Sequence, residues 1–320
     1  MRQAALAHPW QTRQVIVIVA PGQGSQTPGF LEPWLADPAA REQLETISDA
    51  VGIDLVAHGT TSDADTIRDT AVAQPLIVAA GLVTARALLA DGRRDKVDAV
   101  AGHSVGEVTA AAVAGILSET DAVTFVRERG REMARAASLE ATGMSAVIGG
   151  DEDALLARLA DLDLSPANFN GGGQLVVAGA LPALEQLAAE PVAGTRVIPL
   201  QVAGAFHTRY MEPAVAQLGL VAAGLETHDP SIRIWTNKDG SEISSGKHFL
   251  ELMVGQVSSP VRWDRVMESM AAAGVTGIVE LAPAGALVGL AKRGLKGIPA
   301  VAVKTPEDLQ AAFDLIDGNA

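Results

Sequence analysis

The chain has 320 residues and a formal net charge of −14, and its 48% of hydrophobic and 19% of charged residues are ordinary for a globular protein. The acidic charge argues against nonspecific binding to nucleic acid, which needs a dense cationic surface. Cysteine is absent, and this excludes a thiol nucleophile, a disulfide framework and a zinc site with cysteine ligands.

We predict that residues 1–14 form a flexible extension, and this stretch lacks the apolar run of a signal peptide. No apolar run reaches the about 20 residues of a membrane span, so we expect a cytoplasmic protein with no membrane partner. The β-branched run over 15–20 predicts a strand buried on both faces of a parallel sheet.

The loop after this strand, PGQGSQ at 21–26, lacks the third glycine of a dinucleotide-binding loop, because Thr27 stands there. We interpret it as a loop that exposes backbone groups at a strand end, where open α/β sheets bind ligands. Helices are predicted over 34–51 and 75–90, the second with Pro75 in its first turn.

A serine at the apex of a tight turn is the strongest chemical signal in the chain. A short apolar strand over 97–101 runs into GHSVG at 102–106, and an Ala- and Val-rich helix follows. In such an elbow the glycines let neighbouring backbone pass closely, and the helix directs its first N–H groups at the serine oxygen. A glycine-rich loop with an incidental serine is the alternative. Because the strand and the helix stand where the elbow needs them, we predict that Ser104 is a nucleophile.

The chemistry needs a base for the serine, and six histidines are available. His103 adjoins the serine, but successive residues on a turn point apart. His8 lies in the predicted extension, and the histidines at 58, 228 and 248 stand in polar, loop-like surroundings. His207 remains, and it lies at a predicted domain junction, where clefts form. The oxyanion is expected to bind the Val105 N–H and a second N–H from the loop that contains Gln23. An acyl-enzyme mechanism follows, and both a hydrolase and a transferase remain open.

The pattern changes after residue 143. Strand, helix, strand, strand, helix and strand are predicted in this order, at 144–148, 151–160, 166–170, 174–178, 181–190 and 195–202. This βαββαβ order is a complete ferredoxin-like unit, so we predict an inserted subdomain at 141–204, with a glycine hairpin turn at 171–173.

The segments 15–140 and 205–320 are then expected to form one α/β core with a mostly parallel sheet. Helix 121–137 carries several arginines, most of which should lie on a solvated face. The later strands are predicted at 232–236, 277–281 and 301–303. The later helices are predicted at 249–257, 261–273, 287–294 and 306–316. No spacing typical of a metal site occurs.

Five motifs together carry a resemblance to a known family. They are PGQGSQ at 21–26, GHSVGE at 102–107, RG at 129–130, GAFH at 204–207 and QVSSPVRW at 256–263. In this order and at these separations they resemble bacterial malonyl-CoA:acyl carrier protein transacylases, from about Ile16 to Leu315. Malonyl-specific acyltransferase domains of polyketide synthases share most of these motifs. A trans-acting polyketide acyltransferase is therefore the close alternative, and a serine esterase is a more distant one.

The resemblance implies an α/β-hydrolase-like core with a ferredoxin-like insert. It implies that a malonyl group moves from malonyl-CoA to the phosphopantetheine thiol of acyl carrier protein through a malonyl-serine intermediate, for fatty-acid synthesis. It also implies a monomer that holds no bound cofactor. It assigns Ser104 as the nucleophile and His207 as the general base and later acid, with the histidine oriented by the segment of Gln256. Gln23 and Val105 are expected to form the oxyanion hole. Arg129 is expected to pair with the malonyl carboxylate, Phe206 to select malonyl over methylmalonyl, and Asn170 to line the cleft near the acyl donor.

Two further features concern a loop and the carrier protein. The chain has ELAPAG at 280–285, where the resembled family usually has Gly-Pro-Gly, so the resemblance does not predict the conformation of this loop. The carrier protein of the family's reaction is acidic, as this chain is, so a local basic patch has to receive it. The two candidate groups are Lys292, Arg293 and Lys296, and Arg93, Arg94 and Lys96.

Overall fold

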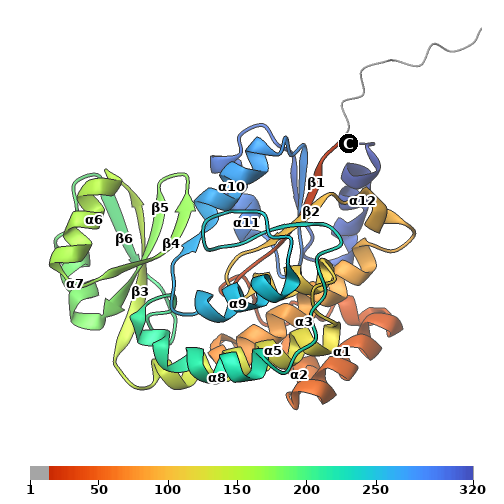
Figure 1. The fold of residues 1–320 in the computed structure, drawn as a ribbon, viewed down its shortest axis with the longest axis horizontal. Helices are drawn as coiled ribbons and strands as arrows, with labels where there is room; N and C mark the ends of the chain where they lie inside the picture. Colours follow the sequence, from red (N-terminus) through yellow and green to blue (C-terminus); the bar gives the residue numbers. More distant parts are fainter. Residues whose placement is uncertain (1–13, 320) are drawn as a thin grey trace, which may run out of the picture.

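Two five-stranded sheets organise the protein in the computed structural model, which describes residues 14–319 (Figure 1). The predicted extension over 1–14 lies outside the described residues, apart from Gln14. The strand order is β10-β9-β1-β2-β7 in the first sheet and β6-β3-β5-β4-β8 in the second. The α/β class that the sequence predicts is therefore confirmed.

The first sheet is parallel throughout. Its strands are β1 (Ile16–Ala20), β2 (Ala99–Gly102), β7 (Arg233–Trp235), β9 (Gly277–Glu280) and β10 (Ala300–Ala302). Strand β1 lies in the centre and is buried along its whole length. Ile16 and Ile18 belong to one apolar core and Val17 and Val19 to another, because alternate side chains point to opposite faces. This is why the run has no polar residue.

Helices enclose both of these cores. The larger core takes side chains from α1 (Pro38–Val51), α3 (Thr70–Leu88), α4 (Gly106–Val113), α5 (Glu119–Ala137), α8 (Glu212–Ala222), α9 (Gly246–Gln256) and α12 (Leu309–Asp317). The smaller core takes them from α10 (Trp263–Ala272) and α11 (Ala286–Gly294). Single turns of 3₁₀ helix stand at Trp34–Ala36, Thr66–Arg68, Arg93–Lys96, Arg209–Met211 and Pro306–Asp308.

Two helix starts differ from the sequence predictions because aspartates cap them. The helix predicted over 34–51 is divided at Asp37, whose carboxylate accepts from the N–H of Ala39. Helix α3 begins at Thr70, where Asp69 accepts from the Ala71 N–H, so Pro75 lies inside the helix and not in its first turn. Helix α3 is also long and apolar enough to cross a membrane by length and composition alone, but 78% of its apolar window is buried inside the protein.

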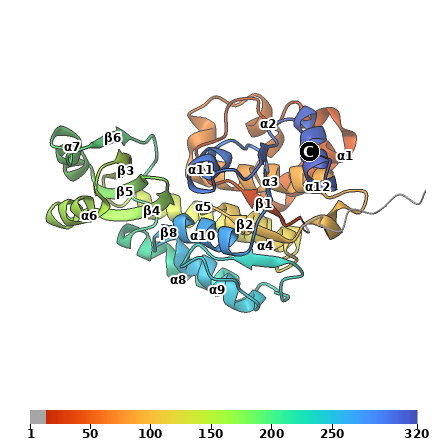
Figure 2. The ribbon, with the colours of Figure 1, turned by 90° about the horizontal axis from the view of Figure 1, so that it is seen from above.

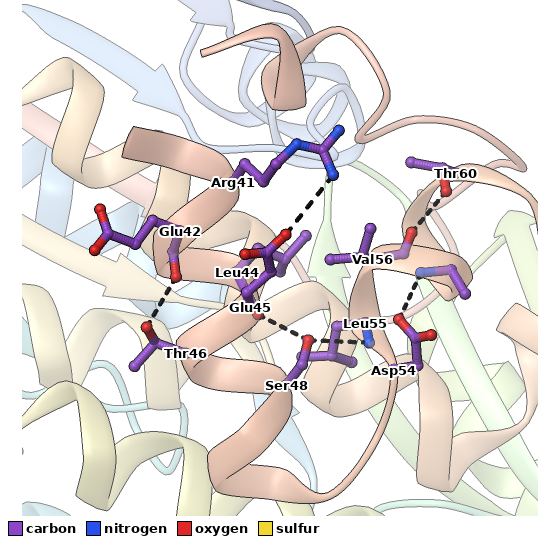
Figure 3. A network of polar contacts seen from close by, with 11 residues as sticks. Arg41, Glu42, Leu44, Glu45, Thr46, Ser48, Asp54, Leu55, Val56 and Thr60 are labelled. Carbon is purple, nitrogen blue, oxygen red and sulfur yellow. Dashed lines mark hydrogen bonds and ion pairs between the residues drawn. The ribbon is translucent and has the colours of Figure 1, made fainter. Parts of the chain in front are cut away.

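A short helix, α2 (Leu55–Thr60), joins the end of α1 in a polar network that Figure 3 shows. The Ser48 hydroxyl donates to the Leu44 carbonyl in α1 (2.7 Å) and accepts from the N–H of Leu55 (3.2 Å). Asp54 caps α2 through the N–H of Ala57 (2.9 Å). Sequence reasoning missed α2 because six residues are too few for an apolar period to appear.

The second sheet lies with its two helices at one end of the molecule (Figures 1 and 2). It contains β3 (Thr142–Gly149), β4 (Ser165–Gly171), β5 (Gln174–Ala180) and β6 (Thr195–Pro199), with α6 (Glu152–Asp161) and α7 (Leu181–Ala189). These four strands are antiparallel in the order β6-β3-β5-β4, which is the order of a ferredoxin-like unit. Val147, Leu175 and Val177 pack against α6 and α7, whereas Met144 and Val176 join the larger core.

A fifth strand, β8 (Val261–Arg262), adds to this sheet in parallel with β4. It comes from the chain beyond the predicted insert, and it replaces the first turn of the helix predicted over 261–273. The Arg262 N–H donates to the Asn237 carbonyl (2.8 Å), so a partner distant in sequence holds this segment extended. The second sheet is thereby joined to the strand ends of the first.

Candidate active site

The turn between β2 and α4 carries Ser104 at its apex, with the backbone in the left-handed region (φ 53°). A side chain at Gly102 would place its Cβ 2.0 Å from the carbonyl carbon of Gly106. A Cβ at Gly106 would lie 2.1 Å from the carbonyl oxygen of Ala20. Because both contacts are to backbone, the elbow can turn so tightly only with glycine at 102, and it can approach the end of β1 so closely only with glycine at 106.

Ser104 and His207 meet across the cleft between distant segments. The Ser104 hydroxyl donates to Nε2 of His207 at 2.7 Å. Nδ1 of His207 donates to the backbone carbonyl of Gln256 at 2.9 Å, so this tautomer leaves Nε2 free to accept. The His207 backbone is also left-handed (φ 62°), and its N–H donates to the Val257 carbonyl (3.0 Å). A carbonyl thus stands where many serine enzymes have a carboxylate.

The electrostatics of the pair favour a neutral base. His207 is buried, and desolvation together with the positive charge of Arg129 lowers its pKa to about 3. A neutral imidazole at physiological pH can take the serine proton without first losing one of its own.

A cavity of about 410 Å³ contains this pair. Loops from the parallel sheet and strands from the second sheet both contribute to its wall. The residues to which the resemblance assigns a role in catalysis or acyl binding line the cavity, apart from Gln256; they are Gln23, Ser104, Val105, Arg129, Asn170, Phe206 and His207. Gln256 lies behind this wall and contacts His207 and Arg129. Within residues 14–319, no three His, Asp or Glu residues are grouped so that they could hold a metal ion.

Two backbone N–H groups beside Ser104 are available to a bound oxygen atom. Among the described residues, neither the Val105 N–H nor the Gln23 N–H donates to a protein acceptor. A Cβ added to Gly22 would lie 3.7 Å from the Ser104 Cβ, so the Gln23 loop packs against the elbow. The Gln23 side chain holds this loop through the Arg68 carbonyl (3.1 Å). Two unused backbone N–H donors of this kind are what an oxyanion hole requires.

Arg129 projects from α5 into the cavity wall and is only 1% exposed. One guanidinium nitrogen, Nη1, donates to Oε1 of Gln74 at 2.5 Å, and the other, Nη2, donates to Oε1 of Gln256 at 2.7 Å. Nη2 also lies 3.4 Å from the Ser104 hydroxyl. Burial lowers the pKa of Arg129 to about 10, which still leaves it charged at neutral pH. A buried cation so close to a nucleophile favours a substrate with a negative group.

Two residues that sequence reasoning did not select support the elbow from below. Glu107 is 1% exposed; it accepts from the Asn237 N–H at 2.6 Å and from Nε2 of Gln256. Asn237 accepts from the Ser104 N–H and donates to the Gly102 carbonyl, both at 2.7 Å. Burial raises the pKa of Glu107 to about 8, and these hydrogen bonds and the charge of Arg129 only partly offset that rise. Their positions in the chain could have indicated them, because Asn237 follows a strand of the parallel sheet and Glu107 lies in the first turn after the elbow.

His103 contacts the second sheet and not the nucleophile. Its Nε2 donates to Oδ1 of Asn170 in β4 at 2.9 Å, and its ring meets that of Trp263 edge to face at 5.6 Å. Successive side chains of the elbow therefore point apart, as the sequence analysis expects. Asn170 lines the cavity, but its amide oxygen is already used by this contact.

The loop over 280–285 is held by a buried carboxylate. Glu280 accepts from the N–H groups of Gly285 (2.9 Å), Leu287 (2.9 Å) and Val288 (2.8 Å), at the start of α11. Ala284 has a positive φ of 49°, at a loop where the resembled family usually has glycines. Alanine thus adopts the left-handed conformation here, and the loop still places Leu287 on the cavity wall.

The fold and the paired Ser104 and His207 are the arrangement expected of an acyl transferase, and comparison with known proteins agrees. Residues 17–308 match the acyl transferase domain family, so the chain belongs to that family. It is 49% identical over 305 residues to the malonyl CoA-acyl carrier protein transacylase of Mycobacterium tuberculosis, covering 94% of this chain and 100% of the relative. It is 34% identical over 305 residues to the Escherichia coli protein of the same name, covering 93% and 98%.

Solved structures give the same result. The crystal structure of MCAT from Mycobacterium tuberculosis superposes with a TM-score of 0.91 at 49% identity, over 93% of this chain and 99% of that one. A malonyl-transacylase in complex with a type II polyketide acyl-carrier protein superposes with a TM-score of 0.88 at 30% identity, over 94% and 99%. The family that the sequence motifs resemble is therefore confirmed.

The lowered pKa of His207 predicts how the reactivity of Ser104 depends on pH. Because His207 stays neutral well below 6.5, labelling of Ser104 by a fluorophosphonate should change less than about threefold between pH 8 and pH 5. Rates are measured by intact mass, with Ser104→Ala as the unlabelled control and circular dichroism to confirm folding at pH 5. A rate that falls with a midpoint near 6.5 would contradict the burial of a neutral base.

Proposed function

We propose that the chain transfers a malonyl group from malonyl-CoA to the phosphopantetheine thiol of an acyl carrier protein, through a malonyl ester of Ser104. One observation carries this proposal: the buried Arg129 guanidinium lies 3.4 Å from the hydroxyl of a serine that is paired with a histidine. A nucleophile beside a receptor for carboxylate suits an acyl group with a free acid end. The names of the relatives support the same substrates.

In the first half-reaction, His207 Nε2 takes the proton of Ser104 as the serine oxygen attacks the thioester carbonyl. The N–H groups of Gln23 and Val105 hold the negative oxygen of the tetrahedral intermediate. When the intermediate collapses, the carbon–sulfur bond breaks and the coenzyme A sulfur leaves with the proton from His207. The carbonyl of Gln256 holds the Nδ1–H throughout, so the imidazole keeps its orientation while it carries charge.

The second half-reaction reverses this order with another thiol. The phosphopantetheine thiol gives its proton to His207, and its sulfur attacks the malonyl ester. The ester bond to Ser104 breaks, and the serine oxygen recovers the proton. A serine esterase would complete the cycle with water, so the two functions differ in whether breakdown of the ester needs a thiol. A transferase has to keep water away from the ester, and the buried apolar side chains of Phe206 and Met144 in the cavity wall would help to exclude it.

The acyl group is selected at its carboxylate and at its α-carbon. Arg129 pairs with the malonyl carboxylate, and Phe206 crowds the α-carbon, so that malonyl is preferred over methylmalonyl. Asn170 lines the cleft near the acyl donor. We further propose a cytoplasmic monomer without a bound cofactor that serves fatty-acid synthesis; a type II polyketide carrier, as in one structural relative, is the alternative partner.

The carrier protein is proposed to dock on Lys292, Arg293 and Lys296, which we call the α11 patch. All three side chains are exposed, and Arg293 lies on the rim of the cavity, where it donates to Gln174 at 2.9 Å. The other basic group is used within the chain. Arg93 and Lys96 pair with Asp317, and Arg94 donates to Ser231. Within residues 14–319 none of these three cations pairs with a carboxylate, and a cationic group that reaches the cavity rim at Arg293 suits an acidic partner whose prosthetic arm has to enter there.

Mixing the protein with malonyl-CoA should give an adduct of one malonyl group by intact mass. Ser104→Ala should give none, because the ester has no oxygen to form on. The adduct should discharge within seconds on addition of holo-acyl carrier protein and persist without a thiol. An adduct that disappears equally fast in buffer alone would favour the esterase.

Substituting Arg129→Ala should remove most of the preference for malonyl-CoA over acetyl-CoA. The intact site should reject acetyl-CoA by roughly two orders of magnitude, because acetyl leaves a buried guanidinium unpaired. The ratio of the two kcat/KM values measures this preference independently of the active fraction. If Arg129→Ala keeps the wild-type ratio, the carboxylate binds elsewhere.

Charge reversal separates the two basic groups. Lys292→Glu with Lys296→Glu should raise the KM for the carrier protein about tenfold at low salt, with less effect at high salt, because the contact is electrostatic. Arg93→Glu with Lys96→Glu is the matched control, since it reverses two cations that are already paired with Asp317. The KM for malonyl-CoA reports any damage to the cavity. An equal effect of both changes on the carrier KM would count against the α11 patch.

A further inference from the structure

We propose that Glu107 is a positioning residue for acid recognition: its carboxylate fixes the direction of the Gln256 amide and thereby holds Arg129 beside Ser104. This inference rests on the proposed function, in which Arg129 binds the malonyl carboxylate. Glu107 itself lies in the first turn of α4, buried beneath the elbow. It is not among the residues that line the cavity, so any effect on the substrate has to pass through its neighbours.

The Gln256 amide is surrounded by acceptors at one end and a donor at the other. Its nitrogen Nε2 donates to Oε2 of Glu107 and lies 3.1 Å from the Ser104 carbonyl and 3.3 Å from Oδ1 of Asn237. Its oxygen Oε1 accepts from Nη2 of Arg129 at 2.7 Å. The Ser104 carbonyl can only accept and a guanidinium can only donate, so the amide satisfies both in one direction alone, and in that direction Oε2 of Glu107 accepts from it.

The consequence of the opposite direction is specific to Arg129. A reversed amide would turn its NH₂ toward Nη2 and its oxygen toward Glu107, which leaves a donor facing a donor and an acceptor facing an acceptor. Of its two contacts with amide groups, Arg129 would keep only the one from Nη1 to Gln74, beside the longer contact of 3.4 Å from Nη2 to the Ser104 hydroxyl. A planar guanidinium held at one nitrogen can swing, whereas two contacts fix both its position and its plane. Glu107 thus sets the geometry of a group that it does not touch.

The carboxylate itself is anchored to backbone that cannot turn. Oε1 of Glu107 accepts from the backbone N–H of Asn237 at 2.6 Å. The Asn237 side chain in turn holds the Ser104 N–H and the Gly102 carbonyl. The direction imposed on Gln256 therefore originates in the same strand ends that shape the elbow. Arg129, which would bind the carboxylate, is thereby held in a fixed position relative to Ser104.

Glu107→Gln should lower the ratio of kcat/KM for malonyl-CoA to that for acetyl-CoA by about tenfold or more, chiefly through a higher KM for malonyl-CoA. The new amide oxygen will take the fixed Asn237 N–H, which leaves its NH₂ facing Gln256 and favours the reversed direction. A role confined to stability would lower the active fraction alone and leave the ratio unchanged. A through-space effect of the lost negative charge would strengthen binding of the malonyl carboxylate and raise the ratio. An unchanged or a higher ratio overturns the proposal.

Three further variants make the test specific. Gln256→Met removes the amide but keeps the backbone carbonyl on His207, so it should lower the ratio as Glu107→Gln does, and it serves if Glu107→Gln does not fold. Glu280→Gln is the matched control, a buried carboxylate that also binds backbone N–H groups but does not contact this network, and it should leave the ratio unchanged. Added to Arg129→Ala, Glu107→Gln should cause no further fall.

The proposal and the function on which it rests can fail separately. If Arg129→Ala keeps the wild-type ratio, the proposed role of Arg129 is wrong. If Arg129→Ala lowers the ratio and neither Glu107→Gln nor Gln256→Met does, Arg129 recognises the acid but Glu107 does not position it.

Discussion

The hydrogen bond between Ser104 and His207 is the contact around which the structure is arranged. The two residues are 103 positions apart, and both hold a backbone conformation in the left-handed region that few side chains adopt. Surrounding contacts maintain that strain. The elbow glycines let Ser104 stand at the end of β2, and the carbonyls of Gln256 and Val257 hold the ring and backbone of His207. Because these supports come from three separate segments, the pair exists only in the folded chain.

Burial of charge beside this pair links reactivity to selectivity. Removing a guanidinium and a carboxylate from water costs several kcal/mol for each ion, and only paired hydrogen bonds and mutual attraction offset that cost. Gln256 stands between Arg129 and Glu107 and gives each of them a neutral partner. Burial and the same guanidinium lower the pKa of His207, so the group proposed to bind the acid end also helps to keep the base neutral. An acyl group with a carboxylate would compensate a cation that the fold leaves incompletely paired.

The second sheet contributes to the site through one of its faces. Met144, Asn170 and Val176 face the cavity, while alternate residues of the same strands pack against α6 and α7. Three contacts join this sheet to the core near the cavity: strand β8 beside β4, His103 with Asn170, and Arg293 with Gln174. The wall is therefore held in register with the nucleophile, and a shift of one strand by a single residue would turn its polar side chains away from the cavity.

The amino-acid sequence by itself determined the α/β order, the ferredoxin-like unit and the elbow, because these depend on local periodicity and on glycines a few residues apart. Its motifs also identified the family and directed attention to His207 and Arg129. Only the tertiary structure decided the start of α3 and the pairing of β8, where an aspartate cap and a distant carbonyl outweigh local pattern. The same holds for Glu107 and Asn237, 130 positions apart: a buried polar network has no period in sequence, since each partner is chosen by proximity in space.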